Sequence, residues 1–265
     1  MRRLNGSELI KNHLSKISTD LEVDNNDPQY SSQNLNYIVL DLVKKSIEDL
    51  HRLNPDQKIV ITEFGARAGF LGKYLNDNFK NIIYTGFEPY PQVGSLHNIF
   101  VETCEESINN KLSSDIISRT DIFIYADVLE HLSDPWRHLQ HIYRLAKFGA
   151  KIIASIPNFY HHSSLSLISD GEFNYEEWGV LDFTHLRFFG INNILNLFEL
   201  TGWRIHPSSI TPAFDPVGLK LVQSYAKDGM NSWSNNQLTW HIRSYEDAVS
   251  LGAYQFAVTS EKPFK

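Results

Sequence analysis

The chain has 265 residues, 42% of them hydrophobic and 21% charged, and its 24 Lys and Arg against 31 Asp and Glu give a net charge of −7. This length is sufficient for one sizeable core, and the composition excludes collagen-like, disordered and repeat-array chains. Sequence-independent nucleic-acid binding needs surplus cations, so the acidic balance predicts no nucleic-acid partner.

The single cysteine, Cys104, leaves no internal disulfide to form, which favours a reducing compartment and therefore a cytoplasmic location. No stretch approaches the ~18 apolar residues that a membrane span requires, so no span is expected. The basic start of the chain has no apolar run after it and does not resemble a secretory signal. A homo-oligomer is compatible with these features.

The first 35 residues form a polar lead-in in which apolar residues recur at near-helical spacing until residues 24–28 stop the pattern. An amphipathic helix is predicted at 36–53. Short apolar runs and helical patterns then alternate along the chain. Strands are predicted at 58–63, 82–88, 99–101, 121–126 and 151–156, with helices at 71–79 and 135–147.

The last third of the chain is less regular. A helix is predicted at 194–200, ended by Gly202 at the usual stop position, and strands are predicted at 204–210 and 254–259. The predicted organisation is an N-terminal extension (1–35), a core (36–210), an insertion (211–249) and a final segment with the last strand (250–265).

The alternation of strands and helices over about 100 residues predicts an α/β fold, a parallel sheet with helices on both faces. Ligands of such sheets bind beyond the carboxyl ends of the strands. The informative residues are therefore expected in five segments, 63–69, 88–91, 102–105, 126–131 and 155–162.

The turn after the first of these strands is built from small residues. Gly65 allows a tight turn, and Ala66, Ala68 and Gly69 leave room for a ligand to approach the backbone. The spacing is Gly-x-x-x-Gly and differs from the Gly-x-Gly-x-x-Gly of dinucleotide sites. Glu88 ends the next strand, where a carboxylate can accept hydrogen bonds from both hydroxyls of a ribose.

Three later segments carry a family resemblance. Residues 127–132 read D-V-L-E-H-L, residues 155–158 read S-I-P-N, and residues 182–189 read D-F-T-H-L-R-F-F. In this order and spacing they resemble class I S-adenosylmethionine (SAM) dependent methyltransferases, in the branch that often accompanies glycan and O-antigen biosynthesis. The resemblance covers about residues 58–203 and the last strand.

The resemblance implies a Rossmann-like, seven-stranded, mostly parallel sheet whose last strand is antiparallel. It implies SAM as the cofactor and no resident metal. The first motif corresponds to Glu63, Gly65 and Gly69, and the ribose-binding acid to Glu88. The adenine-facing segment corresponds to Glu102, Thr103 and Cys104, and the floor beneath the methionine part to Ala126, Asp127 and Val128.

Two positions depart from the family pattern. Arg67 stands where the first turn usually has its middle glycine, and Thr103 stands where an acidic residue is common. A guanidinium about 5 Å from the sulfonium would repel it by roughly 3 kcal/mol at an effective dielectric of about 20. An Arg67 side chain that filled the turn would therefore be incompatible with the enzymatic interpretation.

A hydroxyl acceptor needs a base to remove its proton, and histidine suits that task near neutral pH. His185 is the first candidate for base or substrate contact, and His131 is placed nearer the cofactor. Asp182 either orients His185 or makes a local turn bond, and Arg187 suits an anionic substrate group. The adjacent pair His161 and His162 lacks ligand spacing, so no metal site is predicted.

Aromatic residues are frequent from 159 to 203, and core packing or a dimer surface is favoured for them over a sugar-binding pocket. The predicted function is O-methylation of a sugar or glycan precursor. One alternative is a non-catalytic member of the fold that acts as a binding or assembly protein. Another is an NAD(P)-dependent oxidoreductase, in which Arg67 would lie beside a phosphate.

Overall fold

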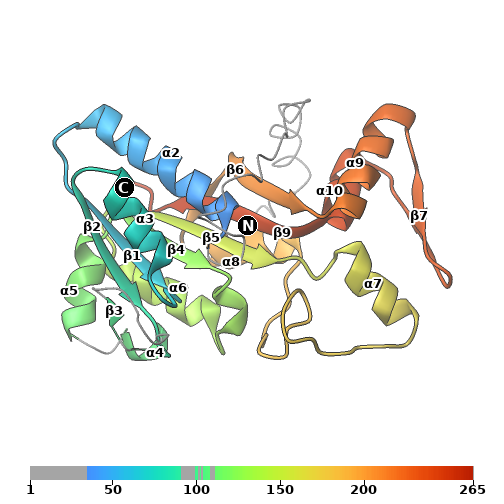
Figure 1. Ribbon diagram of the computed structural model, residues 1–265, viewed down its shortest axis with the longest axis horizontal. Helices are drawn as coiled ribbons and strands as arrows, with labels where there is room; N and C mark the ends of the chain where they lie inside the picture. The colour runs from blue at the N-terminus through green and yellow to red at the C-terminus, as the bar shows by residue number, and fades with distance from the viewer. Residues whose placement is uncertain (1–34, 91–98, 101, 103, 108–110, 265) are drawn as a thin grey trace.

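The computed structural model describes residues 35–90, 99, 100, 102, 104–107 and 111–264 (Figure 1). Its centre is a seven-stranded sheet with the order β3-β2-β1-β4-β5-β9-β6. The strands are β1 (Ile59–Phe64), β2 (Ile82–Phe87), β3 (Ile99–Phe100), β4 (Ile122–Ala126), β5 (Lys151–Pro157), β6 (Arg204–Phe214) and β9 (Ala253–Glu261). β1 to β5 pair in parallel and β9 is antiparallel to both β5 and β6, which confirms the expected Rossmann-like sheet.

Helices cover both faces of this sheet. They are α2 (Tyr37–Leu53), α3 (Phe70–Asn78), α4 (Cys104–Ser107), α5 (Lys111–Arg119), α6 (Pro135–Leu145), α7 (His162–Ser169), α8 (Ile191–Leu200), α9 (Pro216–Asp228) and α10 (Tyr245–Gly252). The sequence patterns predicted α2, α3, α6 and α8 but not α4, α5 or α7. No helix among the described residues combines the length and the apolar character needed to cross a membrane.

The alternation of side chains along the strands divides the core into two layers. Ile122 and Ile124 of β4 face a layer that α2 and α3 cover, together with Ile59, Ile61 and Ile153. Phe123 and Tyr125 of the same strand face the other layer, which α6 and α8 cover and which contains the buried Trp203. A strand buried on both faces explains why the 121–126 run is apolar almost throughout.

The segment between β6 and β9 forms one end of the molecule, opposite β3 (Figure 1). β6 continues to Phe214, so the predicted insertion boundary at 211 falls inside this strand. The segment contains α9, α10 and a hairpin of β7 (Ser232–Ser234) and β8 (Thr239–His241). α9 and α10 approach closely through two glycines, since a Cβ at Gly218 would lie 1.9 Å from the Gly252 carbonyl oxygen. The expected helical lead-in, residues 1–34, lies outside the described residues.

Candidate active site at the carboxyl ends of the parallel strands

The turn after β1 requires left-handed backbone at three positions. Gly65 has φ 76° and Gly69 has φ 77°, and Arg67 between them has φ 47°. A Cβ at Gly65 would lie 2.5 Å from Cγ2 of Val128, so glycine lets this turn pack directly against the turn after β4. The predicted small-residue turn therefore meets the predicted Val128 floor.

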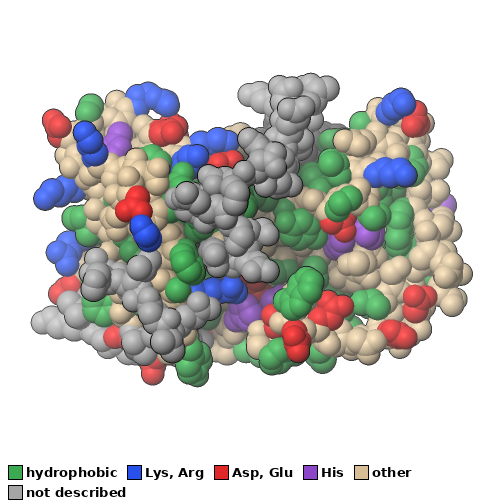
Figure 2. Space-filling model, in the orientation of Figure 1, with side chains coloured by type: hydrophobic (Ala, Val, Ile, Leu, Met, Phe, Trp, Pro, Cys, Tyr) green, Lys and Arg blue, Asp and Glu red, His purple; other side chains and the backbone are tan. Residues whose placement is uncertain are grey.

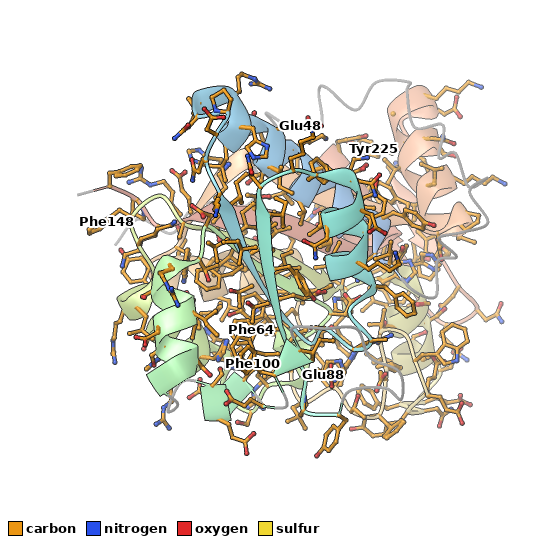
Figure 3. The ribbon with its side chains drawn as sticks, turned by 60° about the vertical axis from the view of Figure 1, so that its left-hand side comes forward. Glu48, Phe64, Glu88, Phe100, Phe148 and Tyr225 are labelled. Atoms are coloured by element: carbon orange, nitrogen blue, oxygen red, sulfur yellow. The ribbon has the colours of Figure 1, made fainter. Side chains whose placement is uncertain are left out.

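Glu88 lies beside this turn. Its carboxylate is buried and accepts hydrogen bonds from the backbone N–H groups of Arg67 and Tyr90, each at 2.9 Å. Figure 3 shows Glu88 at the same end of the sheet as Phe64 and Phe100. A carboxylate has about four acceptor sites, so Glu88 keeps capacity for ligand hydroxyls while it fixes the turn.

Glu63 is buried beneath the same turn, where its carboxyl accepts a hydrogen bond from the Tyr84 hydroxyl. Burial raises the pKa of Glu63 to about 7, because desolvation outweighs the Tyr84 hydrogen bond that favours the anion. The Arg67 side chain is exposed, so it does not fill the turn. Its positive charge opposes part of the burial-induced rise in the pKa values of Glu63 and Asp127.

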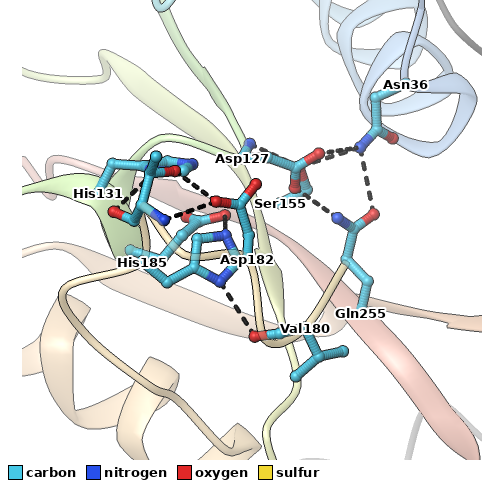
Figure 4. A network of polar contacts seen from close by, with 10 residues as sticks. Asn36, Asp127, His131, Ser155, Val180, Asp182, His185 and Gln255 are labelled. Atoms are coloured by element: carbon cyan, nitrogen blue, oxygen red, sulfur yellow. Dashed lines mark hydrogen bonds and ion pairs between the residues drawn. The ribbon is translucent and has the colours of Figure 1, made fainter. Parts of the chain in front are cut away.

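Asp127, with φ 56°, is the centre of a polar network that sequence reasoning did not anticipate (Figure 4). Its carboxylate accepts hydrogen bonds from Ser155 Oγ at 2.8 Å, from Asn36 Nδ2 at 3.3 Å and from Gln255 Nε2. Asn36 Nδ2 also lies 3.1 Å from both Ser155 Oγ and Gln255 Oε1. Burial raises the pKa of Asp127, and the Ser155 and Asn36 hydrogen bonds oppose that effect.

The expected adenine-facing segment is described only in part. Cys104 is half-buried at the start of α4, and Glu102 accepts a hydrogen bond from Ser113 Oγ at 2.7 Å. Thr103 lies outside the described residues. Ala66 is buried in the first turn, and Ala126 at the end of β4 is half-buried beside Asp127. These residues, except Thr103, surround the same end of the sheet as Glu88.

The predicted catalytic residues come together from two segments. The rings of His131 and His185 lie with their centroids 4.7 Å apart (Figure 4). Nδ1 of His131 lies 3.0 Å from Thr184 Oγ1 and 3.2 Å from the Thr184 carbonyl, and Nδ1 of His185 lies 3.0 Å from the Val180 carbonyl. Because carbonyls accept, the Nδ1 atom of each ring carries a proton in these contacts.

Asp182 makes a local turn bond rather than orienting the His185 ring. Its Oδ1 accepts from the Thr184 N–H at 2.7 Å and from Thr184 Oγ1 at 2.5 Å. Asp182 therefore acts on His131 through Thr184. The guanidinium of the exposed Arg187 donates to the carbonyls of Ser133 and Leu186, and its expected role toward an anionic substrate group stays a prediction.

Glu130 is the residue of this cluster that sequence reasoning missed. It is 1% exposed, and neither carboxyl oxygen has a hydrogen-bond partner among the described residues. Oε1 lies 3.9 Å from Nε2 of His185. Burial raises the pKa of Glu130 well above its usual range, because a charged carboxylate is poorly solvated there. Its place in the D-V-L-E-H-L segment, next to His131, was the available signal.

A surface hollow of about 740 Å³ lies elsewhere, between α9 and the β7–β8 hairpin. Its lining is Tyr225, Gly229, Asn231, His241, Ile242 and Arg243, none of which was predicted as a site residue. The convergence of carboxylates and histidines makes the carboxyl ends of the parallel strands the candidate active site.

Sequence comparison matches residues 38–208 to the family described as "Methyltransferase domain". The chain belongs to this methyltransferase family. The match spans well over half of the chain and covers the first turn, Glu88, Asp127 and the histidine cluster. A search of curated proteins finds no match.

Solved structures share the methyltransferase fold at low identity. The CurJ carbon methyltransferase has a TM-score of 0.51 at 13% identity, covering 85% of this chain and 54% of that one. The [4+2]-cyclase SpnF has a TM-score of 0.51 at 15% identity, covering 91% of this chain and 85% of that one. A SAM-dependent methyltransferase from Archaeoglobus fulgidus has a TM-score of 0.47 at 15% identity, covering 84% and 94%. The two structures with a TM-score of 0.51 share the fold of this chain, and SpnF, a [4+2]-cyclase, indicates that the fold also serves other chemistry.

Proposed function

We propose that this methyltransferase transfers the methyl group of SAM to a hydroxyl of a sugar-like acceptor. The observation that carries the proposal is one convergence at the sheet edge. A buried carboxylate, Glu88, holds the first turn, and the ring of His131, in the segment that follows Asp127, packs against the ring of His185 from a second segment. The cofactor of this family, SAM, supplies an electrophilic methyl group on a positively charged sulfur.

The residues of the first turn fit such a cofactor. Glu63, Glu88 and Asp127 place three carboxyl groups around a turn whose one cation, Arg67, is exposed, so the donor set suits a cationic ligand. Glu88 would hold the ribose, and Gly65 and Gly69 would allow close approach of the adenosine part. Asp127 is held rigid by Asn36, Ser155 and Gln255 and would face the methionine part.

The geometry favours His131 over His185 as the base. His131 is half-buried, whereas His185 is buried and its Nε2 faces Glu130. Burial and the neighbouring His185 lower the pKa of His131, so its ring is neutral and able to accept a proton at pH 7. Hydrogen bonding of Nδ1 to Thr184 fixes the tautomer that leaves Nε2 free. His185 then packs against the His131 ring and positions it.

The acceptor surface is supplied by the segment between α7 and α8. Residues 171–179 are exposed, and they include Phe173, Tyr175 and Trp178 beside Glu172 and Glu176. Figure 2 shows hydrophobic and acidic side chains together on the lower part of this face. Aromatic faces stack on the apolar faces of sugar rings, and carboxylates accept hydrogen bonds from hydroxyls. This combination favours an uncharged, hydroxyl-rich acceptor over an anionic one.

The test is release of S-adenosylhomocysteine in reactions of labelled SAM with neutral sugars and glycan precursors. Replacing His131→Gln should lower kcat by about 10²–10⁴-fold while the Kd for SAM stays unchanged. His206→Gln is the matched control, because His206 is an exposed histidine on β6 paired with Glu261. It should retain the activity of the parent protein.

Three outcomes separate the alternatives. Label transferred to an amine or carbon acceptor, with no transfer to hydroxyls, would contradict the proposed acceptor but keep the methyltransferase. SAM binding without transfer to any acceptor would favour a non-catalytic member of the fold. Binding of NAD or NADP in preference to SAM would favour the oxidoreductase, against which the family match and the antiparallel β9 already count.

A further inference from the structure

A second cluster of ligand-type side chains lies where α7 and α9 begin, apart from His131 and His185. His161 precedes α7, His162 is the first residue of α7, and Asp215 precedes α9. One Nε2 or carboxylate atom from each lies within 4.8 Å of those of the other two. The two segments are 53 residues apart in sequence, which is why the adjacent histidines alone predicted no ligand set.

The distances in this cluster are poor for hydrogen bonds. Nε2 of His161 lies 3.6 Å from Asp215 Oδ2, and Nε2 of His162 lies 3.5 Å from Oδ1. Good N–H···O bonds are about 2.7–3.2 Å long. Ligand atoms bound at about 2.0–2.2 Å to one tetrahedral cation are separated by roughly 3.3–3.5 Å. The two nitrogen–oxygen distances, each to a different oxygen of the Asp215 carboxylate, are similar to this separation, and the three ligand atoms all lie within 4.8 Å of one another.

A buried, unpartnered nitrogen points into the cluster. His161 is 3% exposed, and its Nε2 has no hydrogen-bond partner among the described residues. Its Nδ1 lies 2.8 Å from Ser163 Oγ, so with the proton on Nδ1 the Nε2 lone pair faces Asp215. A buried lone pair opposite a carboxylate is unfavourable unless a proton or a cation lies between them.

Two neighbouring groups hold these side chains in place. Ser163 Oγ lies 2.8 Å from Nδ1 of His161, and Asp215 Oδ1 accepts the Gly218 N–H at 2.6 Å. Bonds from Ser163 and Gly218 are the kind of outer contact that orients metal ligands. The positive ends of α7 and α9 oppose a cation here, but that effect is small beside two imidazole–metal bonds.

We propose that His161, His162 and Asp215 bind one divalent transition-metal cation of the Zn²⁺ type and thereby join α7 to α9. Two imidazoles and one carboxylate suit such a cation better than Mg²⁺ or Ca²⁺, which take mainly oxygen ligands. Three protein ligands leave at least one position for water or another ligand.

The test is calorimetric titration of the chelator-treated, full-length protein with Zn²⁺, together with the visible absorption of the Co²⁺ form. One equivalent of Zn²⁺ should bind, and Co²⁺ should give the intense bands of a tetrahedral site. Asp215→Asn should weaken Zn²⁺ binding at least about 100-fold, more than loss of an outer-shell partner does. Asparagine can still cap α9, so this variant separates loss of the ligand from loss of the helix start.

Further variants locate the site. His162→Asn should weaken binding in the same way, while His206→Gln, the exposed histidine on β6, should bind Zn²⁺ like the parent protein. Absence of stoichiometric binding would overturn the proposal. So would binding that Asp215→Asn leaves intact, or binding that His185→Gln abolishes, because the ion would then occupy the Glu130–His131–His185 cluster. None of these readouts depends on methyl transfer, so the proposal and the proposed function fail separately.

Discussion

Replacing Arg67 with glycine should strengthen SAM binding and leave the stability of the protein nearly unchanged. Arg67 stands at the middle of the first turn with φ 47° and an exposed side chain. Its backbone N–H, which donates to Glu88 at 2.9 Å, is retained in the variant. The substitution therefore removes one charge and relieves one strained backbone position without removing the contact that holds the turn.

The backbone contributions nearly cancel. Left-handed backbone costs a residue with a Cβ about 1–2 kcal/mol, and glycine avoids that cost. Glycine in turn loses more conformational freedom on folding, about 0.5–1 kcal/mol relative to alanine. The net gain in the free energy of unfolding is thus expected to be about 1 kcal/mol or less, which moves the melting temperature by no more than a few degrees.

The charge contribution is worked from the exposure of Arg67. If the exposed guanidinium and a bound sulfonium are taken to be roughly 8–10 Å apart at an effective dielectric of about 40–80, Coulomb's law gives a repulsion of about 0.4–1 kcal/mol. That corresponds to about a two- to fivefold gain in SAM affinity. It is well below the repulsion expected for a guanidinium buried in the turn, because the side chain lies in solvent.

Calorimetry with two ligands isolates this effect. S-adenosylhomocysteine carries a neutral thioether, so its affinity should change less than that of SAM in Arg67→Gly. Arg67→Gln removes the charge but keeps the strained backbone. It should shift the ratio of the affinities for SAM and S-adenosylhomocysteine by the same amount as Arg67→Gly. Arg52→Gln, an exposed arginine of α2 paired with Asp49, is the control. A ratio that stays constant in both Arg67 variants would refute the electrostatic reasoning.

Three other predictions concern stability. The pKa of Glu63 in the folded protein is raised from 4.5 to about 7, so its protonated carboxyl stabilises the fold fully below pH 4.5 and loses this effect as the pH rises through 7. Glu63→Gln should therefore remove about 3 kcal/mol of the pH dependence of the free energy of unfolding, measured with urea. An unchanged dependence of stability on pH would contradict the buried carboxyl. Gly218→Ala places a Cβ 1.9 Å from the Gly252 carbonyl oxygen and should lower the free energy of unfolding by about 2 kcal/mol or more. Val217 is exposed, so the control Val217→Ala should be nearly neutral. Equal losses of stability in the two variants would argue against the close approach of α9 and α10. Asp127→Asn replaces one acceptor with a donor facing Asn36, Ser155 and Gln255 and should cost about 1–3 kcal/mol in thermal or urea unfolding; a neutral result would show that the network does not form.

The strands of the sheet were predictable because a strand buried on both faces needs an uninterrupted run of apolar residues, which is visible in the sequence. β4 and β5 are short, apolar and bounded by turn residues, so their limits follow from the sequence to within one residue. α7 has no comparable pattern, whereas α5 is amphipathic and was missed. The sequence of α7, H-S-S-L-S-L-I-S, is half serine, and its helix is stabilised by tertiary contacts rather than by intrinsic propensity.

The candidate site divides in the same way. The first turn and Glu88 were predictable because turn chemistry and strand ends are local features. The partners of Asp127 were not, since Asn36 lies 91 residues before it and Gln255 lies 128 residues after it. For Asp182, the sequence left open whether it orients His185 or makes a local turn bond. Its bonds to Thr184, together with the contact of the His185 ring with the Val180 carbonyl, favour the turn bond.

The most direct test of the account is calorimetric titration of SAM into the parent protein and into Glu88→Ala. One SAM-binding site is expected in the parent protein. A loss of at least about tenfold in affinity is expected in the variant, whose folding is checked by its thermal transition. No binding to the parent protein, or equal binding to a folded Glu88→Ala, would contradict the claim that this end of the sheet holds the cofactor through Glu88.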